Sequence, residues 1–214
     1  MNDKVAVIGL GFVGLTLALF LSRKVKNVTG FDTEKEKIED LKNGQTYFHE
    51  NGLDELLIEN LNQTFFPKSL DEDTPFFDWI FVTVGTPLKS GKPNLSYLFK
   101  TVDFVCSKAA PNAEILLRST VPVGITKEYS DLIMRIRPDL NVSFCPERTI
   151  EGKAIEELQN LPQILASRYV ERNKKILDFF DQLDINVVEL ETTEEAELIK
   201  LFSNIYRDLH FSIA

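Results

Sequence analysis

Short apolar runs rich in β-branched residues alternate with amphipathic stretches along the whole chain. Short apolar runs bounded by glycine or polar residues are typical of buried strands, and amphipathic stretches with helical spacing are typical of helices that cover a sheet. Strands that alternate with helices form parallel sheets, because each crossover helix returns the chain to the same edge. The pattern therefore predicts an α/β fold with a doubly wound, mostly parallel sheet, right-handed crossovers and helices on both faces.

The predicted elements follow one another closely along the chain. Strands are expected at residues 5–8, 27–31, 78–84, 114–117, 142–145 and 186–188, and helices at residues 13–24, 34–41, 53–61, 95–109, 127–136, 170–183 and 193–214. The last helical pattern contains no C-cap glycine and no polar stop. We therefore expect one domain over residues 1–192. Residues 193–214 are expected to start a long central helix that is truncated and would lead to a missing domain.

Composition and charge disfavour several classes of partner. The 214 residues carry 24 Lys and Arg against 33 Asp and Glu, a net charge of −9, whereas nucleic-acid binding needs basic patches. No apolar run is long enough to span a membrane, and no signal peptide precedes the first strand. The two cysteines form no disulfide framework. We expect a cytoplasmic protein that binds neither nucleic acid nor membranes.

A glycine-rich turn follows the first predicted strand and opens the first predicted helix. It reads Gly9-Leu10-Gly11-Phe12-Val13-Gly14. In this pattern the first glycine allows a tight turn, the second lets the backbone approach a pyrophosphate, and the third packs the helix on the strand. Asp32 ends the second strand about 20 residues later, where an acid accepts hydrogen bonds from an adenosine ribose.

The turn and the acid together predict a Rossmann-like domain that binds NAD. NADP is disfavoured because its 2′-phosphate would face the Asp32 carboxylate with no arginine beside it. The alternative is a glycine turn packed for its own sake, with Asp32 as an ordinary helix N-cap. That alternative does not explain why a strand, a glycine turn, a helix, a second strand and an acid follow one another at the spacing of a dinucleotide-binding motif.

Further motifs follow the fingerprint in a specific order. They are Gly9–Gly14 with Asp32, Glu50-Asn51-Gly52-Leu53, Val82-Thr83-Val84-Gly85-Thr86-Pro87, Ser119-Thr120-Val121-Pro122-Val123-Gly124, Pro146-Glu147-Arg148 with Glu151-Gly152, and Glu197 to Asn204 with Tyr206-Arg207-Asp208. In these motifs the chain resembles the UDP-glucose and UDP-N-acetylmannosamine dehydrogenases, which oxidise C6 of a nucleotide sugar. The resemblance covers almost the whole chain.

The resemblance implies the NAD-binding part of a UDP-sugar 6-dehydrogenase. Such an enzyme oxidises the C6 alcohol to an aldehyde and then, through a thioester on a cysteine, to the uronic acid with two NAD per sugar. The family's cysteine lies beyond residue 214. Cys106 falls on a core stripe of a helix and Cys145 precedes Pro146, so we expect neither to be the nucleophile. The fragment alone should be inactive, and the full-length protein should be a homo-oligomer, a dimer.

The resemblance also implies roles for individual residues. Thr120 should position the catalytic water, and Glu147 should act as general base if partial burial raises its pKa toward the working pH. Lys200 and Asn204 share one helix face and can stabilise an oxyanion; alternatively, Lys200 pairs with Glu195 or Glu197 on a solvated face. The predicted catalytic residues are Thr120, Glu147, Lys200 and Asn204. The predicted cofactor-binding residues are Gly9, Gly11, Phe12, Val13, Gly14, Asp32, Lys37, Val84, Gly85, Thr86, Pro87, Ser119, Thr120 and Glu151.

The substrate is expected to be a UDP-N-acetylhexosamine such as UDP-N-acetylmannosamine. The predicted substrate-binding residues are Glu147, Arg148, Lys200, Asn204 and Arg207. Arg148 and Arg207 look like the N-acetylhexosamine branch of the family, and both can donate to an acetamido carbonyl. A site built for that carbonyl discriminates against a sugar without it. UDP-glucose stays the alternative substrate, and both arginines can instead serve the pyrophosphate or an inter-domain contact.

Two other classes of protein stay open at this point. A 6-phosphogluconate or β-hydroxyacid dehydrogenase also has a Rossmann-like domain, but it would carry a glycine-rich substrate motif at residues 119–124. A free-standing NAD-binding module that senses redox state or mediates assembly is the other. No metal is expected, because His49 and His210 lie far apart without ligand partners at known spacings.

Overall fold

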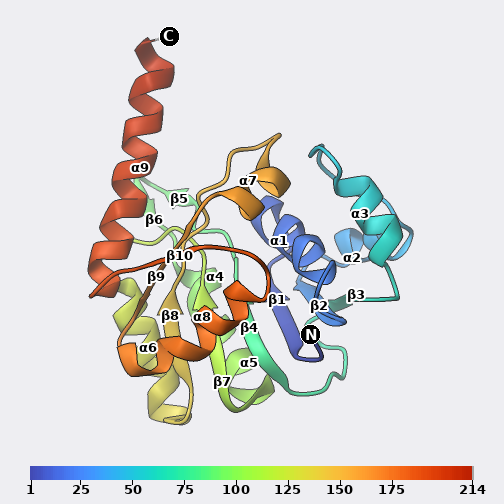
Figure 1. Cartoon of the computed structure of the whole chain (residues 1–214), viewed down its shortest axis with the longest axis horizontal. Coiled ribbons are helices and arrows are strands. Elements are labelled where there is room, and N and C mark those ends of the chain that lie inside the picture. The colour runs from blue at the N-terminus through green and yellow to red at the C-terminus, as the bar shows by residue number, and fades with distance from the viewer. Residues whose placement is uncertain (214) are drawn as a thin grey trace.

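The structure, a computed structural model, describes residues 1–213. Within them, eight strands form one sheet in the order β10-β9-β8-β7-β4-β1-β2-β3, and β5 and β6 form a separate hairpin (Figure 1). The strands are β1 (Lys4–Ile8), β2 (Asn27–Asp32), β3 (Phe65–Ser69), β4 (Phe77–Val82), β5 (Leu88–Lys89), β6 (Lys92–Pro93), β7 (Ala109–Leu117), β8 (Asn141–Phe144), β9 (Gln163–Ser167) and β10 (Val187–Glu189). The helices are α1 (Phe12–Ser22), α2 (Lys35–Lys42), α3 (Leu53–Asn60), α4 (Ser96–Phe99), α5 (Thr101–Lys108), α6 (Ile125–Ile136), α7 (Ala154–Asn160), α8 (Asn173–Asp181) and α9 (Thr193–Ile213), with a 3-10 turn at Val170–Arg172.

The sheet is parallel except at one junction. β1 pairs in parallel with β2 and β4, β3 continues in parallel beyond β2, and β7 and β8 continue beyond β4. β9 pairs antiparallel with β8, and β10 pairs in parallel with β9. The predicted mostly parallel, Rossmann-like sheet is confirmed, and the reversal at β9 is the part that the sequence does not predict.

Two hydrophobic cores lie on the two faces of the sheet. Val5 and Val7 of β1 belong to one core, and Ala6 and Ile8 belong to the other. Buried residues of α1, α2, α3, α7 and α8 pack on the first face, and those of α4, α5, α6 and α9 pack on the second. Burial on both faces is the reason that the parallel strands are continuous apolar runs.

Several elements are missed by the sequence pattern. β3, β9, α7 and the β5–β6 hairpin all lie in stretches without a predicted element. β3 contains Pro67, which is tolerated because this strand lies at the sheet edge and pairs on one side only. The predicted helix over residues 95–109 is interrupted at Lys100, where the Thr101 hydroxyl donates to the Leu98 carbonyl at 2.7 Å. Such a bond competes with the backbone ladder of a helix.

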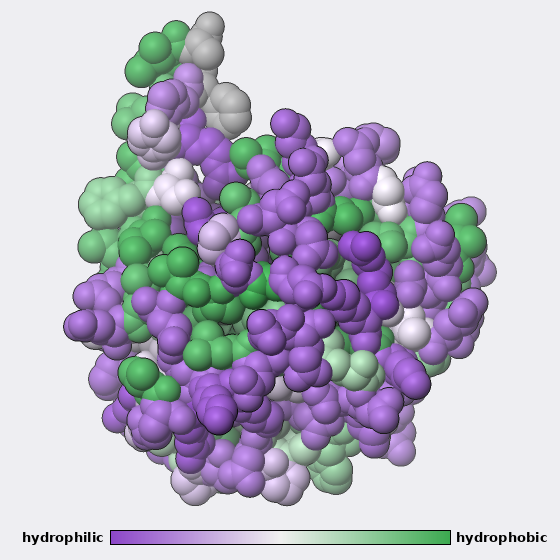
Figure 2. Space-filling view, viewed as in Figure 1, coloured by the Kyte–Doolittle hydropathy of each residue, from purple (hydrophilic) through white to green (hydrophobic). Residues whose placement is uncertain are grey.

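The last helix, α9, is 21 residues long and rises past the edge of the sheet (Figure 1). Its first half packs against β8, β9 and α6. From its middle onward the helix exposes large side chains with apolar surface, namely Phe202, Ile205, Tyr206, Leu209 and Ile213. Figure 2 shows hydrophobic residues, in green, on the projecting part. Over residues 1–213, none of the helices combines the length and the apolar character needed to cross a bilayer.

Candidate functional site

The three glycines of the turn after β1 have different surroundings. Gly9 has φ of +93°, and a Cβ there would lie 3.0 Å from the Cα of Val84. A Cβ on Gly14 would lie 1.8 Å from the carbonyl oxygen of Gly9 and 2.5 Å from the hydroxyl of Thr83. A Cβ on Gly11 would meet no atom within 4 Å. Gly9 and Gly14 therefore permit the turn and its packing, whereas Gly11 leaves open space where a ligand can approach the backbone.

Asp32 is largely buried at the end of β2. Its Oδ2 accepts a 2.8 Å hydrogen bond from the Leu10 N–H inside the glycine turn, and its Oδ1 accepts one of 3.0 Å from the Glu34 N–H. The carboxylate thus orients both the turn and the start of α2. Each oxygen retains acceptor capacity for a ribose hydroxyl.

Two aromatic residues, Tyr47 and Phe48, contact the same turn, and neither is among the predicted site residues. The Tyr47 hydroxyl donates to the Leu10 carbonyl, and the ring of Phe48 lies 5.3 Å from that of Phe12. Burial, followed by the neighbouring carboxylates of Asp32 and Glu34, raises the pKa of Tyr47 far above its ordinary value, so the hydroxyl remains a donor. The position of this pair just before the Glu50-Asn51-Gly52-Leu53 motif is the one signal that the sequence offers.

A cleft of about 810 Å³ lies at the carboxyl ends of β1, β2 and β4. The predicted cofactor-binding residues in it are Gly9, Gly11, Phe12, Val13, Asp32, Lys37, Val84, Gly85, Thr86 and Pro87. The cleft is also lined by Tyr97, Lys100 and Phe104, which the sequence does not single out. Open backbone at Gly11, the N-terminus of α1 and the carboxylate of Asp32 suit the pyrophosphate and ribose of NAD. Gly14, Ser119, Thr120 and Glu151 lie outside the lining, so any cofactor contact of theirs stays a prediction.

Two hydroxyls join the loops at the rim of the cleft. The Ser119 hydroxyl donates to the Val84 carbonyl at 2.6 Å, and the Thr86 hydroxyl donates to the Thr120 carbonyl at 2.6 Å. The loop after β7 is therefore tied to the loop after β4. Ser119 acts here by holding the cleft wall, and the Thr120 backbone lies next to a cleft residue.

A cluster of buried charges lies beside this loop, where β7 and β8 end. Glu147 accepts a 2.6 Å hydrogen bond on Oε2 from Arg118 Nη2, and its Oε1 accepts from the backbone N–H groups of Arg148 and Thr149 at 2.7 and 2.9 Å. Burial alone would raise the pKa of Glu147, but Arg118 and these hydrogen bonds together lower it below its ordinary value. The expectation of a raised pKa is wrong because it does not include the buried partner Arg118.

Neither cysteine has the surroundings of a reactive nucleophile. Cys145 is fully buried, its sulfur accepts a hydrogen bond from Arg118 Nη1 at 3.2 Å, and burial raises the pKa of its thiol to about 11. Cys106 packs in the core on α5, and burial raises its pKa as well. A nucleophilic thiol needs exposure and a lowered pKa.

Lys200 reaches the charge cluster from α9. It is only 7% exposed, and its pKa is lowered to about 8 by burial first and then by the Arg207 guanidinium, against the raising effect of Glu147. The alternative in which Lys200 pairs with a glutamate on a solvated face is therefore wrong. One turn further along α9, the Asn204 Oδ1 accepts a 3.2 Å hydrogen bond from Arg207, so these predicted residues do share one helix face.

Two glutamates that are not among the predicted catalytic or binding residues anchor the loops of the site. Glu197 is fully buried and accepts hydrogen bonds from the Gly124 and Thr126 N–H groups at 2.6 and 2.7 Å, where α6 begins. It therefore fastens α9 to the loop that carries Thr120. A carboxylate is favoured there because the first N–H groups of a helix have no partner within it.

Glu50 holds the next loop in the same way. Its carboxylate accepts from the N–H groups of Gly152 and Ala154 at 2.6 and 2.9 Å, where α7 begins. Asn51 adds a 2.7 Å bond to the Gly152 carbonyl. Glu151 lies on this loop with an exposed side chain, and its contact with the cofactor stays a prediction.

Comparisons with known proteins identify the family. The profile of the "UDP-glucose/GDP-mannose dehydrogenase family, NAD binding domain" matches residues 3–184. A UDP-N-acetyl-D-mannosamine dehydrogenase of Methanococcus vannielii is 30% identical over 99% of this chain and 49% of its own length. The Staphylococcus aureus protein CapL is 30% identical over 100% of this chain and 51% of its own length. The chain therefore spans about half the length of the curated relatives that it matches.

Solved structures agree in fold. A UDP-D-ManNAc dehydrogenase of Pyrococcus horikoshii superimposes with a TM-score of 0.90 at 26% identity, over 96% of this chain and 50% of that one. A UDP-glucose dehydrogenase of Pyrobaculum islandicum superimposes with a TM-score of 0.86 at 25% identity, over 96% and 50%. The profile match covers well over half of the residues, and all the residues that line the cleft lie within it. This chain belongs to the UDP-glucose/GDP-mannose dehydrogenase family, of which it contains the NAD-binding domain.

Proposed function

We propose that the chain is the NAD-binding half of a UDP-sugar 6-dehydrogenase, which oxidises the C6 alcohol of a UDP-N-acetylhexosamine to the uronic acid with two NAD. The short connection between the NAD cleft and the charge cluster carries this proposal. Thr86 lines the cleft and bonds the Thr120 carbonyl, and Arg118, two residues before Thr120, contacts Glu147. Groups suited to proton transfer therefore lie next to the cofactor cleft.

In the first oxidation, Lys200 is the residue assigned to the C6 oxygen. NAD, when bound, supplies the hydride acceptor. An ammonium in a water-excluded site stabilises negative charge that develops on an oxygen. With a pKa of about 8, Lys200 is also able to exchange a proton with that oxygen near neutral pH. Asn204, on the same face of α9, adds an amide donor.

In the hydrolytic step, Thr120 and Glu147 are assigned to the water. The ionised Glu147 can accept a hydrogen bond from a water molecule, and the Thr120 hydroxyl can orient the same molecule. Neither Cys106 nor Cys145 is assigned as the nucleophile that forms the thioester. Because the second oxidation passes through that thioester, we expect the 214-residue chain alone to form no uronic acid from any UDP-sugar. Uronic acid formation that is lost in Cys145→Ser would prove the exclusion of that cysteine wrong.

The N-acetylated sugar is proposed because Arg148 and Arg207 place guanidinium groups close enough to Lys200 to lower its pKa. Guanidinium donors left unpaired by a sugar without the acetamido carbonyl would disfavour that sugar. Relatives named UDP-N-acetyl-D-mannosamine dehydrogenase support the same choice. UDP-glucose is the competing substrate, because a similar solved structure is a UDP-glucose dehydrogenase.

The experiment is an assay of the natural full-length protein for NADH formation. The substrates are UDP-N-acetylmannosamine, UDP-N-acetylglucosamine, UDP-N-acetylgalactosamine and UDP-glucose. We expect one N-acetylated sugar to exceed UDP-glucose in kcat/KM by about a hundredfold or more. Preference for UDP-glucose would defeat the choice of sugar, and no NADH with any sugar would defeat the proposed activity.

Variants separate the roles of the site residues in that assay. Glu147→Gln, Lys200→Ala and Asn204→Ala should each lose turnover and keep NAD binding. Arg207→Ala should lose the preference for the acetamido group. Unchanged selectivity in Arg207→Ala would show that Arg207 does not recognise the acetamido group, and its role would then be to bind the pyrophosphate or to contact another domain.

We also propose that the full-length protein is a dimer that works in the cytoplasm. The exposed apolar side chains on the second half of α9 support association, and two free, buried cysteines suit a reducing compartment. Light scattering on the full-length protein tests the dimer, and a monomer at micromolar concentration would contradict it.

A further inference from the structure

Arg118 follows β7 directly and is fully buried. Its Nη2 donates to Glu147 Oε2 at 2.6 Å and to Gln163 Oε1 at 3.0 Å, and its Nη1 donates to the sulfur of Cys145 at 3.2 Å. Its Nε is buried and has no hydrogen-bond partner among the described residues. The guanidinium is therefore turned toward Glu147 even though one of its own donors stays unsatisfied.

Stability alone does not explain this arrangement. A buried ion pair contributes little net stability, because the desolvation of both charges offsets their attraction, and apolar residues of similar size often do as well. Gln163 begins β9, the strand that runs antiparallel to β8, and the Gln163 side chain holds Arg118 from that side. The Arg118 side chain is thus fixed where β7 and β8 end and β9 begins. Its guanidinium forms an ion pair with a single carboxylate, that of Glu147.

Glu147 is held on both oxygens from different directions. Two backbone N–H groups of its own loop, those of Arg148 and Thr149, bind Oε1. Arg118 is the donor on Oε2. Donors on both oxygens prevent rotation of the carboxylate plane, and the contact with Arg118 provides the fixed point outside the loop.

From these contacts we infer that Arg118 is a positioning residue of the reaction, which fixes the plane of the Glu147 carboxylate and pairs with its negative charge. This inference rests on the proposed function, because that function assigns the hydrolytic water to Glu147. A carboxylate that is always ionised acts by orienting the water and accepting its proton, and it does not titrate within the working pH range.

Three charged or titratable side chains interact with Glu147, namely Arg118 after β7, Cys145 after β8 and Lys200 on α9. On the loop of Glu147 itself, the Arg148 guanidinium donates to the Pro162 carbonyl and lowers the pKa of Lys200. Among the described residues, Arg118 is the one cation in ion-pair contact with Glu147. Lys200 loses its charge around pH 8, and Cys145 stays neutral. Removal of the Arg118 charge should therefore raise the pKa of Glu147.

The test uses the natural full-length protein with two substitutions of Arg118. Arg118→Gln keeps an amide donor and removes the charge, whereas Arg118→Lys keeps the charge and loses the forked donor. Infrared absorption of the protonated carboxyl group across pH, assigned with Glu147→Gln, measures the ionisation of Glu147 without turnover. Arg137→Gln is the matched control, because Arg137 binds Asp139 through Nε and Nη2 at 2.9 and 2.8 Å, away from the cluster.

We expect Arg118→Gln to raise the pKa of Glu147 by about 1 to 3 units. The acid limb of the pH–rate profile should move upward with it. Arg118→Lys should leave Glu147 ionised and still lower kcat by about tenfold to a hundredfold with little change in KM, because the carboxylate plane is no longer fixed. Arg137→Gln should change neither the infrared titration nor the acid limb.

An unchanged pKa of Glu147 in Arg118→Gln, or an unchanged kcat in Arg118→Lys, would overturn the inference. NAD binding and thermal unfolding report whether each variant is folded, and if Arg118→Gln does not fold, Arg118→Lys decides alone. If the wild-type protein oxidises no UDP-sugar, the proposed function fails. The infrared titration then still decides whether Arg118 controls the ionisation of Glu147.

Discussion

The two halves of the ligand-binding edge are built in different ways. After β1 and β2, the cleft is shaped by backbone, with glycines where a side chain would collide and open space at Gly11. After β7 and β8, the edge is shaped by buried charged side chains, chiefly Arg118, Glu147 and Lys200. A substitution in the first half acts by filling space, whereas one in the second half leaves a charge unpaired. Damage to the first half should therefore not depend on pH, and damage to the second half should.

The largest effect should come from Gly14→Ala. The added Cβ would lie 1.8 Å from the Gly9 carbonyl oxygen, and backbone cannot yield as a flexible side chain can. We expect a loss of at least about 3 kcal/mol of unfolding free energy, at or beyond the upper end for overpacking, or failure to fold. Urea denaturation measures it. Gly11→Ala is the control, and it should keep stability within about 1 kcal/mol while weakening NAD binding.

The second prediction concerns the pH dependence contributed by Lys200. Its pKa of about 8 in the folded protein lies below the ordinary 10.5, so the unfolded chain binds more protons between these two values. Unfolding free energy should therefore rise with pH from about 8 to about 10.5, by up to about 3 kcal/mol. Denaturation of the wild type and Lys200→Met at about pH 7 and about pH 10 isolates this contribution. Parallel pH profiles for the two proteins would contradict it.

The third prediction removes the anchor at the start of α6. Glu197→Ala leaves the N–H groups of Gly124 and Thr126 without their partner, which should cost about 1 to 3 kcal/mol. Glu128→Ala is the matched control, because Glu128 is an exposed acid in the first turn of the same helix and should cost only about 0.3 to 1 kcal/mol. Equal losses in the two variants would show that the burial of Glu197 does not matter.

The smallest effect is expected at Asp32. Asp32→Ala removes acceptors for the ribose, each worth about 0.5 to 3 kcal/mol, and should weaken NAD binding about tenfold to a hundredfold. Titration calorimetry with NAD and NADP measures it, and Asp32→Asn separates the loss of charge from the loss of the bonds to Leu10 and Glu34. Equal affinity of the wild type for the two cofactors would refute the predicted preference for NAD.

The same contrast decides how much the sequence can predict. The cofactor half depends on short-range spacing, so Gly9, Gly11 and Gly14 with Asp32 are enough to place the cleft. The face shared by Lys200 and Asn204 also follows from local spacing. These features need no knowledge of which strands are neighbours.

The charge cluster depends on pairings that local patterns do not contain. Arg118 meets Gln163 because β9 reverses direction and begins at the edge where β8 ends. Glu50 and Glu197 bind N–H groups about a hundred and about seventy residues away in the chain. The lowered pKa of Glu147 follows from its contact with Arg118, which needs the ends of β7 and β8 to lie side by side. It therefore becomes predictable only when the strand order is known.

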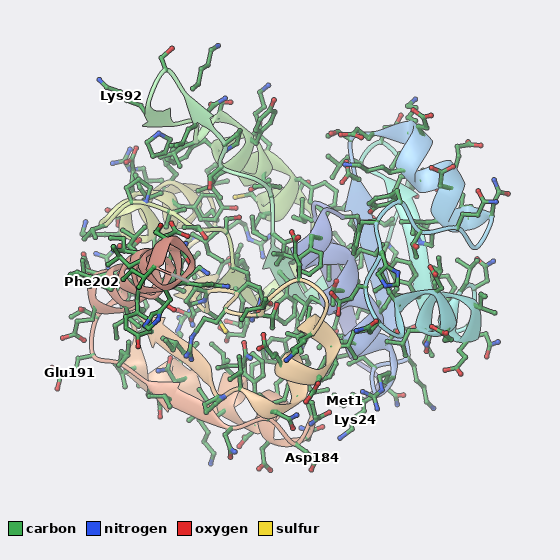
Figure 3. The ribbon with its side chains drawn as sticks, turned by 90° about the horizontal axis from the view of Figure 1, so that it is seen from above. Met1, Lys24, Lys92, Asp184, Glu191 and Phe202 are labelled. Atoms are coloured by element: carbon green, nitrogen blue, oxygen red, sulfur yellow. The ribbon has the colours of Figure 1, made fainter. Side chains whose placement is uncertain are left out.

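The anchoring of α9 at one end also has a mechanical consequence. Glu197 is a pivot near the start of a stiff rod, with Lys200 about 4.5 Å along the axis and the last described residue about 24 Å along it, at 1.5 Å per residue. Figure 3, which looks onto the ligand-binding edge from above, shows Phe202 on the outer side of this rod. If the rod tilts about Glu197, a displacement of about 5 Å at its far end moves Lys200 by only about 1 Å. The short arm of the lever lies in the site, so displacements of the projecting arm reach the Lys200 ammonium strongly attenuated.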